Sequence, residues 1–249
     1  MRKIHWSILK RLHRLFGFRY RLVKRQGARF ILDNKNWIDT RLLIGHQYER
    51  DQISSCIALI NANSMDTLVD VGANIGVYSV LLNVNTTIRE TLAFEPVKCN
   101  YNQLCGNIFV NNLNAKVTAI NKALSDHNRE SKIHIDPEST GVSRMDLEGA
   151  TRKSETFTKE EAITCVKLDD IYNFSERKIF IKIDVEGHEI HVIRGMKKTL
   201  SKNKVVVQVE LLSSERVAEC DSIFESEGFH KLDNPSGDFR YANFTVIES

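Results

Sequence analysis

Proline is scarce in this chain, and no segment is dominated by a few residue types. Three prolines and twelve glycines among 249 residues leave no stretch with the composition of a flexible linker. The five cysteines are odd in number, and no two are spaced as C-x-x-C. This pattern argues against a disulfide framework, a zinc knuckle and an iron–sulfur cluster. The sequence therefore predicts a globular protein of a reducing compartment, without a cysteine-based metal centre.

Long apolar runs are also missing. No uncharged apolar stretch approaches the roughly 20 residues that a membrane-spanning helix needs, and no signal peptide is recognisable at the start. Acidic residues are absent from one region: residues 1–32 contain ten Lys or Arg and no Asp or Glu, although the net charge of the chain is +3. We therefore expect a cytoplasmic protein with a strongly basic beginning and a net acidic remainder.

The opening MRKIHWSILKRLHRLFGF places apolar side chains at helical spacing, with Lys and Arg elsewhere on the wheel. Such a basic amphipathic helix can lie on the anionic inner face of a membrane or on an acidic partner. Alternatively, its apolar stripe packs on the rest of the chain and its charges are solvated. We assign residues 1–38 to a basic N-terminal extension, in which residues 1–29 would touch the membrane, and residues 39–249 to the main domain.

Beyond residue 50, short apolar strands alternate with helical patterns, which predicts an α/β fold with a doubly wound, mainly parallel sheet. Two final strands without a helix between them allow an antiparallel pair at the edge of the sheet. The expected strands are residues 67–71, 91–95, 116–124, 178–185, 204–211, 229–234 and 240–248. The expected helices are residues 77–84, 100–113, 189–202 and 213–229.

A glycine-containing turn follows the first strand of this domain, in DTLVDVGANIGVYSVLL. Gly72 and Gly76 would let backbone N–H groups and a helix N-terminus face a ligand at the carboxyl edge of the sheet. Asn74 stands between the glycines, so the spacing is not the G-x-G-x-x-G of dinucleotide-binding proteins. Asp70 at the mouth of the turn disfavours a pyrophosphate and suits an amino group.

A second acid, Glu95, closes the next strand in AFEP. A carboxylate in this position can accept hydrogen bonds from both hydroxyls of a ribose. Each acid alone could be a helix cap or a solvated side chain. Together they predict a ligand that is an adenosine without phosphates and with an amino-acid tail, a description that S-adenosyl-L-methionine fits.

Several motifs occur in the order and spacing of FkbM-type methyltransferases, and over residues 39–212 the chain resembles this family. They are GHQYERDQ, VDVGANIGVYS, AFEP, NKALSD, KLDDI, IKIDVEGHE and VEL. The resemblance implies a Rossmann-like, seven-stranded sheet with an antiparallel last strand. It also implies S-adenosyl-L-methionine-dependent transfer of a methyl group to a hydroxyl, very often on a sugar of a glycan, a glycolipid or a secondary metabolite.

The resemblance also implies a set of cofactor contacts. Ser125 and Asp126 would lie beside the adenine, and Asp184 follows the fourth strand. AFEP lacks the asparagine that usually follows the proline, so the contact expected there is left open. The full set is Asp70, Gly72, Asn74, Gly76, Glu95, Ser125, Asp126 and Asp184.

Methyl transfer to a hydroxyl needs a base that accepts the proton as attack develops. The fourth strand delivers titratable groups to the carboxyl edge, and the fifth strand ends at Glu210. We select Asp184, Glu186, His188 and Glu210 as catalytic candidates, and Glu189 reads equally well as a helix cap. Asp184 and Glu210 could instead share a Mg²⁺ ion.

Rival activities are disfavoured by absent motifs. Asn-Pro-Pro-Tyr and Pro-Cys do not occur, which argues against methylation of base amines and of base carbons, and no G-x-S-x-G hydrolase elbow occurs. Two alternatives survive. A nucleic-acid methyltransferase could use the basic extension to grip phosphates, although the domain itself is acidic. A module could also bind the cofactor without catalysis.

A polar, charge-rich segment, residues 127–162, separates the third and fourth strands. Part of it, SKIHID, could form an added strand, whereas PESTGVSRMD is typical of a loop. A long loop at the carboxyl edge is well placed to cover the acceptor, and a surface excursion is the alternative.

Overall fold

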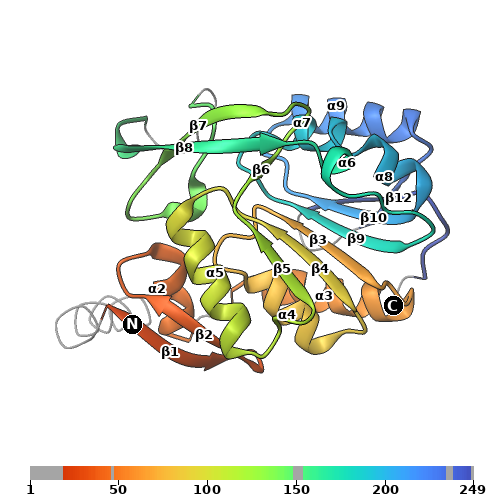
Figure 1. The fold of residues 1–249 in the computed structure, drawn as a ribbon. Coiled ribbons are helices and arrows are strands. Elements are labelled where there is room, and N and C mark those ends of the chain that lie inside the picture. Colours follow the sequence, from red (N-terminus) through yellow and green to blue (C-terminus); the bar gives the residue numbers. More distant parts are fainter. Residues whose placement is uncertain (1–18, 46–47, 148–153, 234–237, 248–249) are drawn as a thin grey trace.

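The structure is a computed structural model that describes residues 19–45, 48–147, 154–233 and 238–247. The basic amphipathic helix expected over residues 1–18 lies outside this described part. A central sheet with helices on both faces dominates the fold (Figure 1). Among the described residues, no helix is long and apolar enough to cross a membrane.

Seven strands form the central sheet, and the doubly wound α/β prediction is confirmed. All neighbouring pairs are parallel except those made by β12, which runs antiparallel between β10 and β11. The antiparallel last strand and the edge pair expected from the sequence are therefore both present. In sheet order the strands are β11 (His230–Leu232), β12 (Phe239–Ala242), β10 (Lys204–Val209), β9 (Lys178–Ile183), β3 (Thr67–Val71), β4 (Glu90–Phe94) and β5 (Val117–Ile120).

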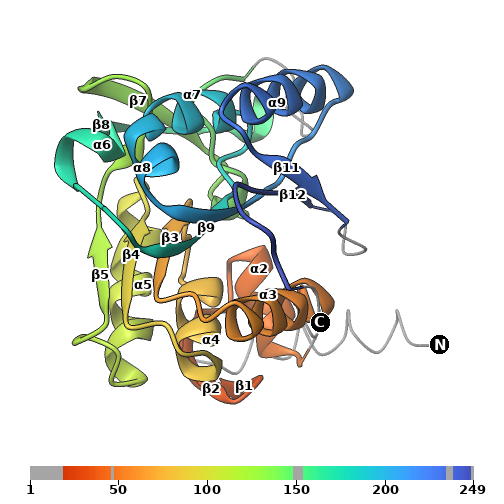
Figure 2. The same ribbon diagram turned by 90° about the vertical axis from the view of Figure 1, so that its right-hand side faces the viewer.

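Two groups of helices cover the sheet, one on each face, as the edge-on view shows (Figure 2). The first group is α3 (Arg50–Ala62), α4 (Val77–Asn85) and α5 (Lys98–Val110). The second group is α6 (Leu168–Ile171), α7 (Glu189–Arg194), α8 (Lys197–Lys202) and α9 (Ser214–Ser226). Each group packs on its own cluster of buried apolar side chains.

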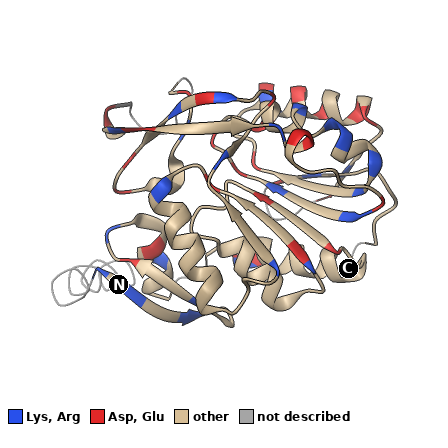
Figure 3. Cartoon of the chain, in the orientation of Figure 1, with Lys and Arg blue, Asp and Glu red and all other residues tan. Residues whose placement is uncertain are grey.

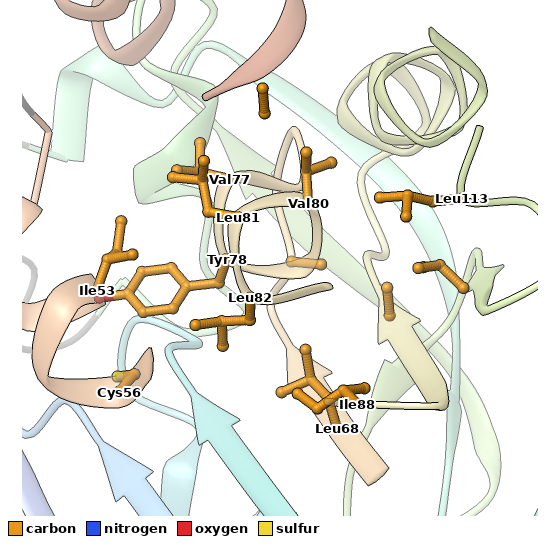
Figure 4. Packing of buried hydrophobic residues seen from close by; sticks show 14 of the residues in the cluster. Ile53, Cys56, Leu68, Val77, Tyr78, Val80, Leu81, Leu82, Ile88 and Leu113 are labelled. Carbon is orange, nitrogen blue, oxygen red and sulfur yellow. The ribbon is translucent and has the colours of Figure 1, made fainter. Parts of the chain in front are cut away.

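The alternation of side chains along the strands divides the core into these two clusters. Leu68 faces α3 and α4, whereas Val69 faces the second group of helices. Helix α4 contributes most of its length to the first cluster, and Tyr78 points from it toward Ile53 and Cys56 of α3 (Figure 4). The consequence is a sheet buried on both faces, as expected for parallel strands joined by helices.

A buried polar row crosses the sheet on the face toward α3 and α4. Asp70 of β3 pairs in register with Lys182 of β9, Lys182 with Gln208 of β10, and Gln208 with Arg240 of β12. All four side chains are at most 4% exposed. The Arg240 Nε donates to Gln208 Oε1 at 2.8 Å, so members of the row satisfy one another. This row lies next to the carboxyl edge of the sheet.

An N-terminal hairpin packs beside the first group of helices. It consists of β1 (Tyr20–Arg25) and β2 (Ala28–Asp33), and α2 (Trp37–Leu43) follows it. Phe30 and Leu32 are fully buried in the same apolar cluster as α4. The boundary expected at residue 38 therefore does not separate the described part of the extension from the core of the domain.

Two elements expected to be continuous are divided. The third strand, expected over residues 116–124, ends at Ile120, and Ala123–Leu124 form β6 in another sheet. The Asn121 side chain donates to the carbonyls of Glu95 and Pro96, both at 2.9 Å, and so turns the chain at this point. The helix expected over residues 189–202 is interrupted at Gly195. A Cβ there would lie 1.9 Å from the Ser125 carbonyl oxygen, so the chain closes tightly on this backbone.

The segment of residues 127–162 builds most of a second, three-stranded sheet. Its strands are β6 (Ala123–Leu124), β7 (Arg129–Ile135) and β8 (Lys159–Val166), in the order β6-β8-β7. The added strand expected at SKIHID is therefore confirmed, whereas β8 was missed. The short 3-10 turns η1 (Thr140–Val142) and η2 (Ser154–Thr156) lie between β7 and β8.

Candidate active site

A cavity of about 200 Å³ lies at the carboxyl edge of the central sheet. It is bounded by the ends of β3, β4, β9 and β10, by the start of α2, and by the segment between β7 and β8. Of the residues selected from the sequence, seven line it: Gly72, Asn74, Glu95, Asp184, Glu186, His188 and Glu210. The others, Asp70, Gly76, Ser125 and Asp126, are not among its lining residues.

The turn after β3 is shaped by backbone conformations that favour glycine. Gly72 has φ +78°, and a Cβ there would lie 1.9 Å from the Asp184 carbonyl oxygen. Gly76 has φ +85°, and its Cβ would meet Leu104 of α5. Asn74 between them is also left-handed, with φ 52°. The first glycine therefore brings β3 and β9 together at the cavity, and the second packs the start of α4 on α5.

Glu95 is a buried carboxylate that reaches the cavity from the end of β4. Its two oxygens accept hydrogen bonds from the Asn74 and Val97 backbone amides, each at 2.8 Å. Burial raises the pKa of Glu95 to about 7. The neighbouring Asn74 Oδ1 is buried and has no hydrogen-bond partner among the described residues. Oxygen acceptors so placed fit a ligand that brings its own hydroxyl and amino hydrogens.

Asp184 stands on the floor of the cavity between an ammonium and a second carboxyl group. Lys182, two residues earlier on the same face of β9, donates from Nζ to Asp184 Oδ2 at 2.9 Å. Burial alone would raise the pKa of Asp184, but the charge of Lys182 outweighs it and lowers that pKa. Glu210 shares a hydrogen bond with Asp184, whose negative charge raises the pKa of Glu210 to about 9. At neutral pH, Asp184 is therefore ionised and Glu210 carries the proton.

Lys182 joins this carboxyl pair to the buried polar row. It is 4% exposed, and its Nζ lies 4.5 Å from the centre of the Tyr78 ring. Burial opposes its charge, but Asp184, Glu49 and Asp70 together raise the pKa of Lys182. Asp70 itself accepts a hydrogen bond from Ser79 Oγ at 2.5 Å and does not reach the cavity. Its place is behind the floor, beside Lys182.

The turn after Asp184 is fixed by an ion pair between Glu189 and Arg216. Glu186 lines the cavity and is left-handed, with φ 54°. Glu189 is buried, and its carboxylate accepts hydrogen bonds from the Gly187 amide at 2.7 Å and from Arg216 at 3.2 Å. The Arg216 guanidinium also donates to the Gly187 carbonyl oxygen. Glu189 thus fixes the turn at the start of α7.

The remaining predicted residues form a cluster at one end of the cavity. His188 Nε2 lies 2.9 Å from Ser125 Oγ, and the His188 and His191 rings stack with centroids 4.5 Å apart. Asp126 pairs with His127 at 2.6 Å and with His191 at 2.9 Å. Burial, with repulsion from His191, lowers the pKa of His188 to about 4. The ring that lines the cavity is therefore neutral at pH 7.

The roof of the cavity was not foreseen in detail. It comes from η1 and its flanking residues, with the start of α2. The Trp37 amide donates to the Glu138 carbonyl at 3.0 Å, and Asn100 donates to the Thr140 carbonyl at 3.3 Å. Trp37 lines the cavity while 42% exposed, with the Arg41 guanidinium 4.6 Å from its ring centre. The segment between β7 and β8 thus lines the cavity, in agreement with the expectation that it covers the site and not with the alternative of a surface excursion.

Glu49 is a second lining residue that the sequence did not single out, although it lies in the GHQYERDQ motif. It precedes α3 in the left-handed conformation, with φ 45°. Its carboxylate accepts a hydrogen bond from the Tyr78 hydroxyl at 2.7 Å. Glu49 and Asp184 therefore approach Lys182 from two different elements.

A metal site is not apparent in the part of the chain that the structure describes. No group of three or more His, Cys, Asp or Glu side chains there is arranged to hold a metal ion. One oxygen of Asp184 already accepts a hydrogen bond from Lys182. The Mg²⁺ dependence suggested by the sequence stays a prediction, to be tested by assay.

The mainly parallel α/β sheet, with a cavity beyond its strand ends that is lined by the glycine turn and by Glu95 and Asp184, has the arrangement of Rossmann-like folds that bind ligands at this edge. The methyltransferase FkbM domain family matches residues 70–236. This chain belongs to that family, and the resemblance seen in the sequence is confirmed.

Individual relatives share less than a third of their residues with this chain over the aligned regions. The chain is 28% identical over 202 residues to methyltransferase sdnD of Sordaria araneosa, with 70% of this chain and 77% of sdnD covered. It is 26% identical over 157 residues to hexuronic acid methyltransferase AglP of Haloferax volcanii, with 61% of this chain and 59% of AglP covered. A solved FkbM methyltransferase from Methylobacillus flagellatus aligns at 17% identity and a TM-score of 0.49, over 72% of this chain and 43% of that one.

Proposed function

We propose that this protein is an S-adenosyl-L-methionine-dependent O-methyltransferase that acts on a hydroxyl of a sugar, in a glycan, a glycolipid or a secondary metabolite. The observation that carries the proposal is the carboxyl pair of Asp184 and Glu210, held by Lys182 in the same cavity as Gly72, Asn74 and Glu95. Membership of the FkbM family supports the methyl transfer.

When bound, the cofactor supplies a methyl group on a positively charged sulfur. In the transfer a carbon–oxygen bond to the acceptor forms, the carbon–sulfur bond breaks, and the hydroxyl proton leaves to a base. Asp184 is that base, because it is the ionised member of the carboxyl pair at neutral pH. Glu210, which carries a proton below about pH 9, donates a hydrogen bond that orients Asp184.

The cofactor end of the cavity is assigned to Glu95 and the turn of Gly72 and Asn74. The Glu95 carboxylate accepts hydrogen bonds from the ribose hydroxyls, and Asn74 Oδ1, which is buried without a partner, accepts from a ligand donor. Gly72 packs against the Asp184 carbonyl oxygen and also lines the cavity, so the cofactor can approach the backbone of this turn without meeting a side chain.

Two observations favour a sugar as the acceptor. The exposed Trp37 ring at the cavity offers a flat apolar face against which the C–H groups of a pyranose can pack. The name of one relative, hexuronic acid methyltransferase AglP, also points to a carbohydrate. We further propose that the protein is cytoplasmic and that its N-terminal region contacts a membrane.

The first test is calorimetric titration of the purified protein with S-adenosyl-L-methionine and, separately, with NAD. One-to-one binding of S-adenosyl-L-methionine alone would support the cofactor. The second test is transfer of a labelled methyl group to a panel of neutral, amino and uronic acid sugars, with and without Mg²⁺. Binding without transfer to any hydroxyl-bearing acceptor would instead favour a module that binds cofactor without catalysis, and transfer to RNA would favour a nucleic-acid methyltransferase.

Replacing Glu95 should weaken cofactor binding. We expect Glu95→Ala to cost about 1–3 kcal/mol of binding free energy, because the ribose hydroxyls lose their carboxylate acceptor. Glu90→Ala is the matched control, since Glu90 begins the same strand at the opposite edge of the sheet and pairs with Arg177 at 3.2 Å. Unchanged affinity in Glu95→Ala, measured by calorimetry, would remove Glu95 from the cofactor site.

Replacing Trp37 should weaken acceptor binding without slowing the chemical step. We expect Trp37→Ala to raise the acceptor KM about 5- to 20-fold, equivalent to about 1–2 kcal/mol, with kcat nearly unchanged. Trp37→Phe should recover most of the loss because it keeps an aromatic face. A fall in kcat with an unchanged KM would contradict a stacking role for Trp37.

A further inference from the structure

The N-terminal hairpin presents apolar side chains to solvent. Tyr20 is 51% exposed and Leu22 is 59% exposed, although β-strands usually turn such residues toward a core. Exposure alternates along β1, so Tyr20, Leu22 and Lys24 point outward while Val23 packs against the apolar core. One face of the hairpin therefore presents two large apolar side chains and a lysine to solvent.

The pairing of β1 with β2 extends this face. Leu22 pairs with Ile31 and Lys24 pairs with Arg29, and cross-strand partners share a face of the sheet. Ile31 reaches Gly106 of α5, since a Cβ on this glycine would lie 3.0 Å from Ile31 Cδ1. Phe109, 68% exposed, lies one turn beyond Gly106 on the same side of α5.

The charge around this face is positive. Residues 19–32 hold five Lys or Arg and no acid, and Lys and Arg mark both strands of the hairpin (Figure 3). Arg19 lies with its guanidinium 5.2 Å from the centre of the Tyr20 ring, and its side chain is 56% exposed. The nearest acid in the sequence, Asp33, is 7% exposed and pairs with Arg19 at 2.9 Å. The exposed charges of the face are therefore cationic.

We propose that the outer face of the hairpin, made by Tyr20, Leu22, Lys24 and Arg29, docks on an anionic lipid surface. Aromatic and leucine side chains that insert at the headgroup level, ringed by Lys and Arg that contact anionic lipids, are the combination that interfacial binding requires. A membrane that contains anionic lipids supplies both the negative charge and the apolar layer that this face would contact. This inference is independent of the methyl-transfer proposal, because lipid binding needs no turnover.

The test is co-sedimentation of the full chain with vesicles. We expect binding to vesicles that contain about 30% phosphatidylglycerol, none to pure phosphatidylcholine, and loss of binding in about 0.5 M NaCl, where charges are screened within a few ångströms. The double variant Tyr20→Thr with Leu22→Thr should lower the partition coefficient about tenfold or more. Ile171→Thr is the matched control, because Ile171 is 38% exposed on the opposite helical layer.

Several results would overturn the proposal. Vesicle binding that the double variant leaves unchanged would place the contact in residues 1–18 alone. Concentration-dependent dimerisation that the double variant abolishes, without vesicle binding, would make the face an interface between two copies. Binding of an RNA oligonucleotide, with the same dependence on Leu22 and without lipid binding, would identify a nucleic acid as the partner.

Discussion

Asp184→Asn should bind S-adenosyl-L-methionine almost as tightly as the unchanged protein and lose most of its turnover. A positioned base contributes typically 10²- to 10⁴-fold to a proton transfer, so we expect kcat to fall by about that factor. The asparagine keeps the size of the side chain and still offers an oxygen to Lys182, whose Nζ lies 2.9 Å from Asp184 Oδ2. The asparagine cannot, however, take up the proton of the acceptor hydroxyl. Calorimetry measures the affinity for the cofactor, and the rate of single-turnover methyl transfer measures the chemical step, so the two experiments separate binding from catalysis.

Asp238→Asn is the control for this experiment. Asp238 accepts a hydrogen bond from Gln208 at 2.7 Å but is not among the residues that line the cavity. We expect near-normal turnover in this variant. Full activity in Asp184→Asn would exclude this residue as the base and as a metal ligand. If excess Mg²⁺ does not restore activity to Asp184→Asn, the base role of Asp184 is favoured over the metal role.

Lys182→Met should shift the acid limb of the pH profile to higher pH. The ammonium of Lys182 lowers the pKa of Asp184 against the effect of burial, so its removal lets burial raise that pKa. An adjacent opposite charge typically moves the pKa of a carboxyl group by about 1–3 units. Activity that needs the ionised form of Asp184 is lost as pH falls through its pKa. Between the old and the new pKa we therefore expect kcat/KM to fall about 10- to 1,000-fold.

Lys178→Met makes the same substitution at the other end of β9, where Lys178 Nζ donates to the Asn63 carbonyl at 3.0 Å. We expect no shift of the pH profile there. Glu210→Gln provides a second measurement: the titration near pH 9 assigned to Glu210 should disappear while the acid limb persists. An unchanged acid limb in a folded Lys182→Met protein would show that Lys182 has a structural role alone.

Most of the fold could be predicted because its signals are local. Strands such as Lys204–Val209 are short segments rich in valine, and the segments between them carry helical spacing, so the alternation follows from the sequence. The breaks at Asn121 and Gly195 could not be predicted, since each depends on a distant backbone. Asn121 donates to carbonyls at the end of β4, and Gly195 closes on the Ser125 carbonyl.

The residues that line the cavity were predicted where a motif ends a strand, and they were missed where tertiary packing brings a residue to the cavity. Glu95 and Asp184 lie at strand ends, which the sheet brings together by its topology. Trp37 and Glu49 come from segments whose distance from the cavity is set by how α2 and α3 pack, and no spacing in the sequence encodes that. Lys182 lies within the IKIDVEGHE motif, but the sequence does not predict which carboxylate a lysine inside an apolar strand will contact.

The buried polar row has a consequence for how the sheet assembles. A shift of β9 by one residue would turn Lys182 to the face of α7 to α9, among the fully buried Ile181 and Ile183 positions. The ammonium would lose Asp70 and Asp184 and remain in an apolar layer, at a large cost in free energy. The row therefore favours the observed register of β3, β9, β10 and β12, because a shift of one residue in either direction raises the free energy of the folded sheet. Lys182 also donates to Asp184 at 2.9 Å, so the residue that marks the alignment of the strands is the same one that lowers the pKa of the carboxyl group in the cavity.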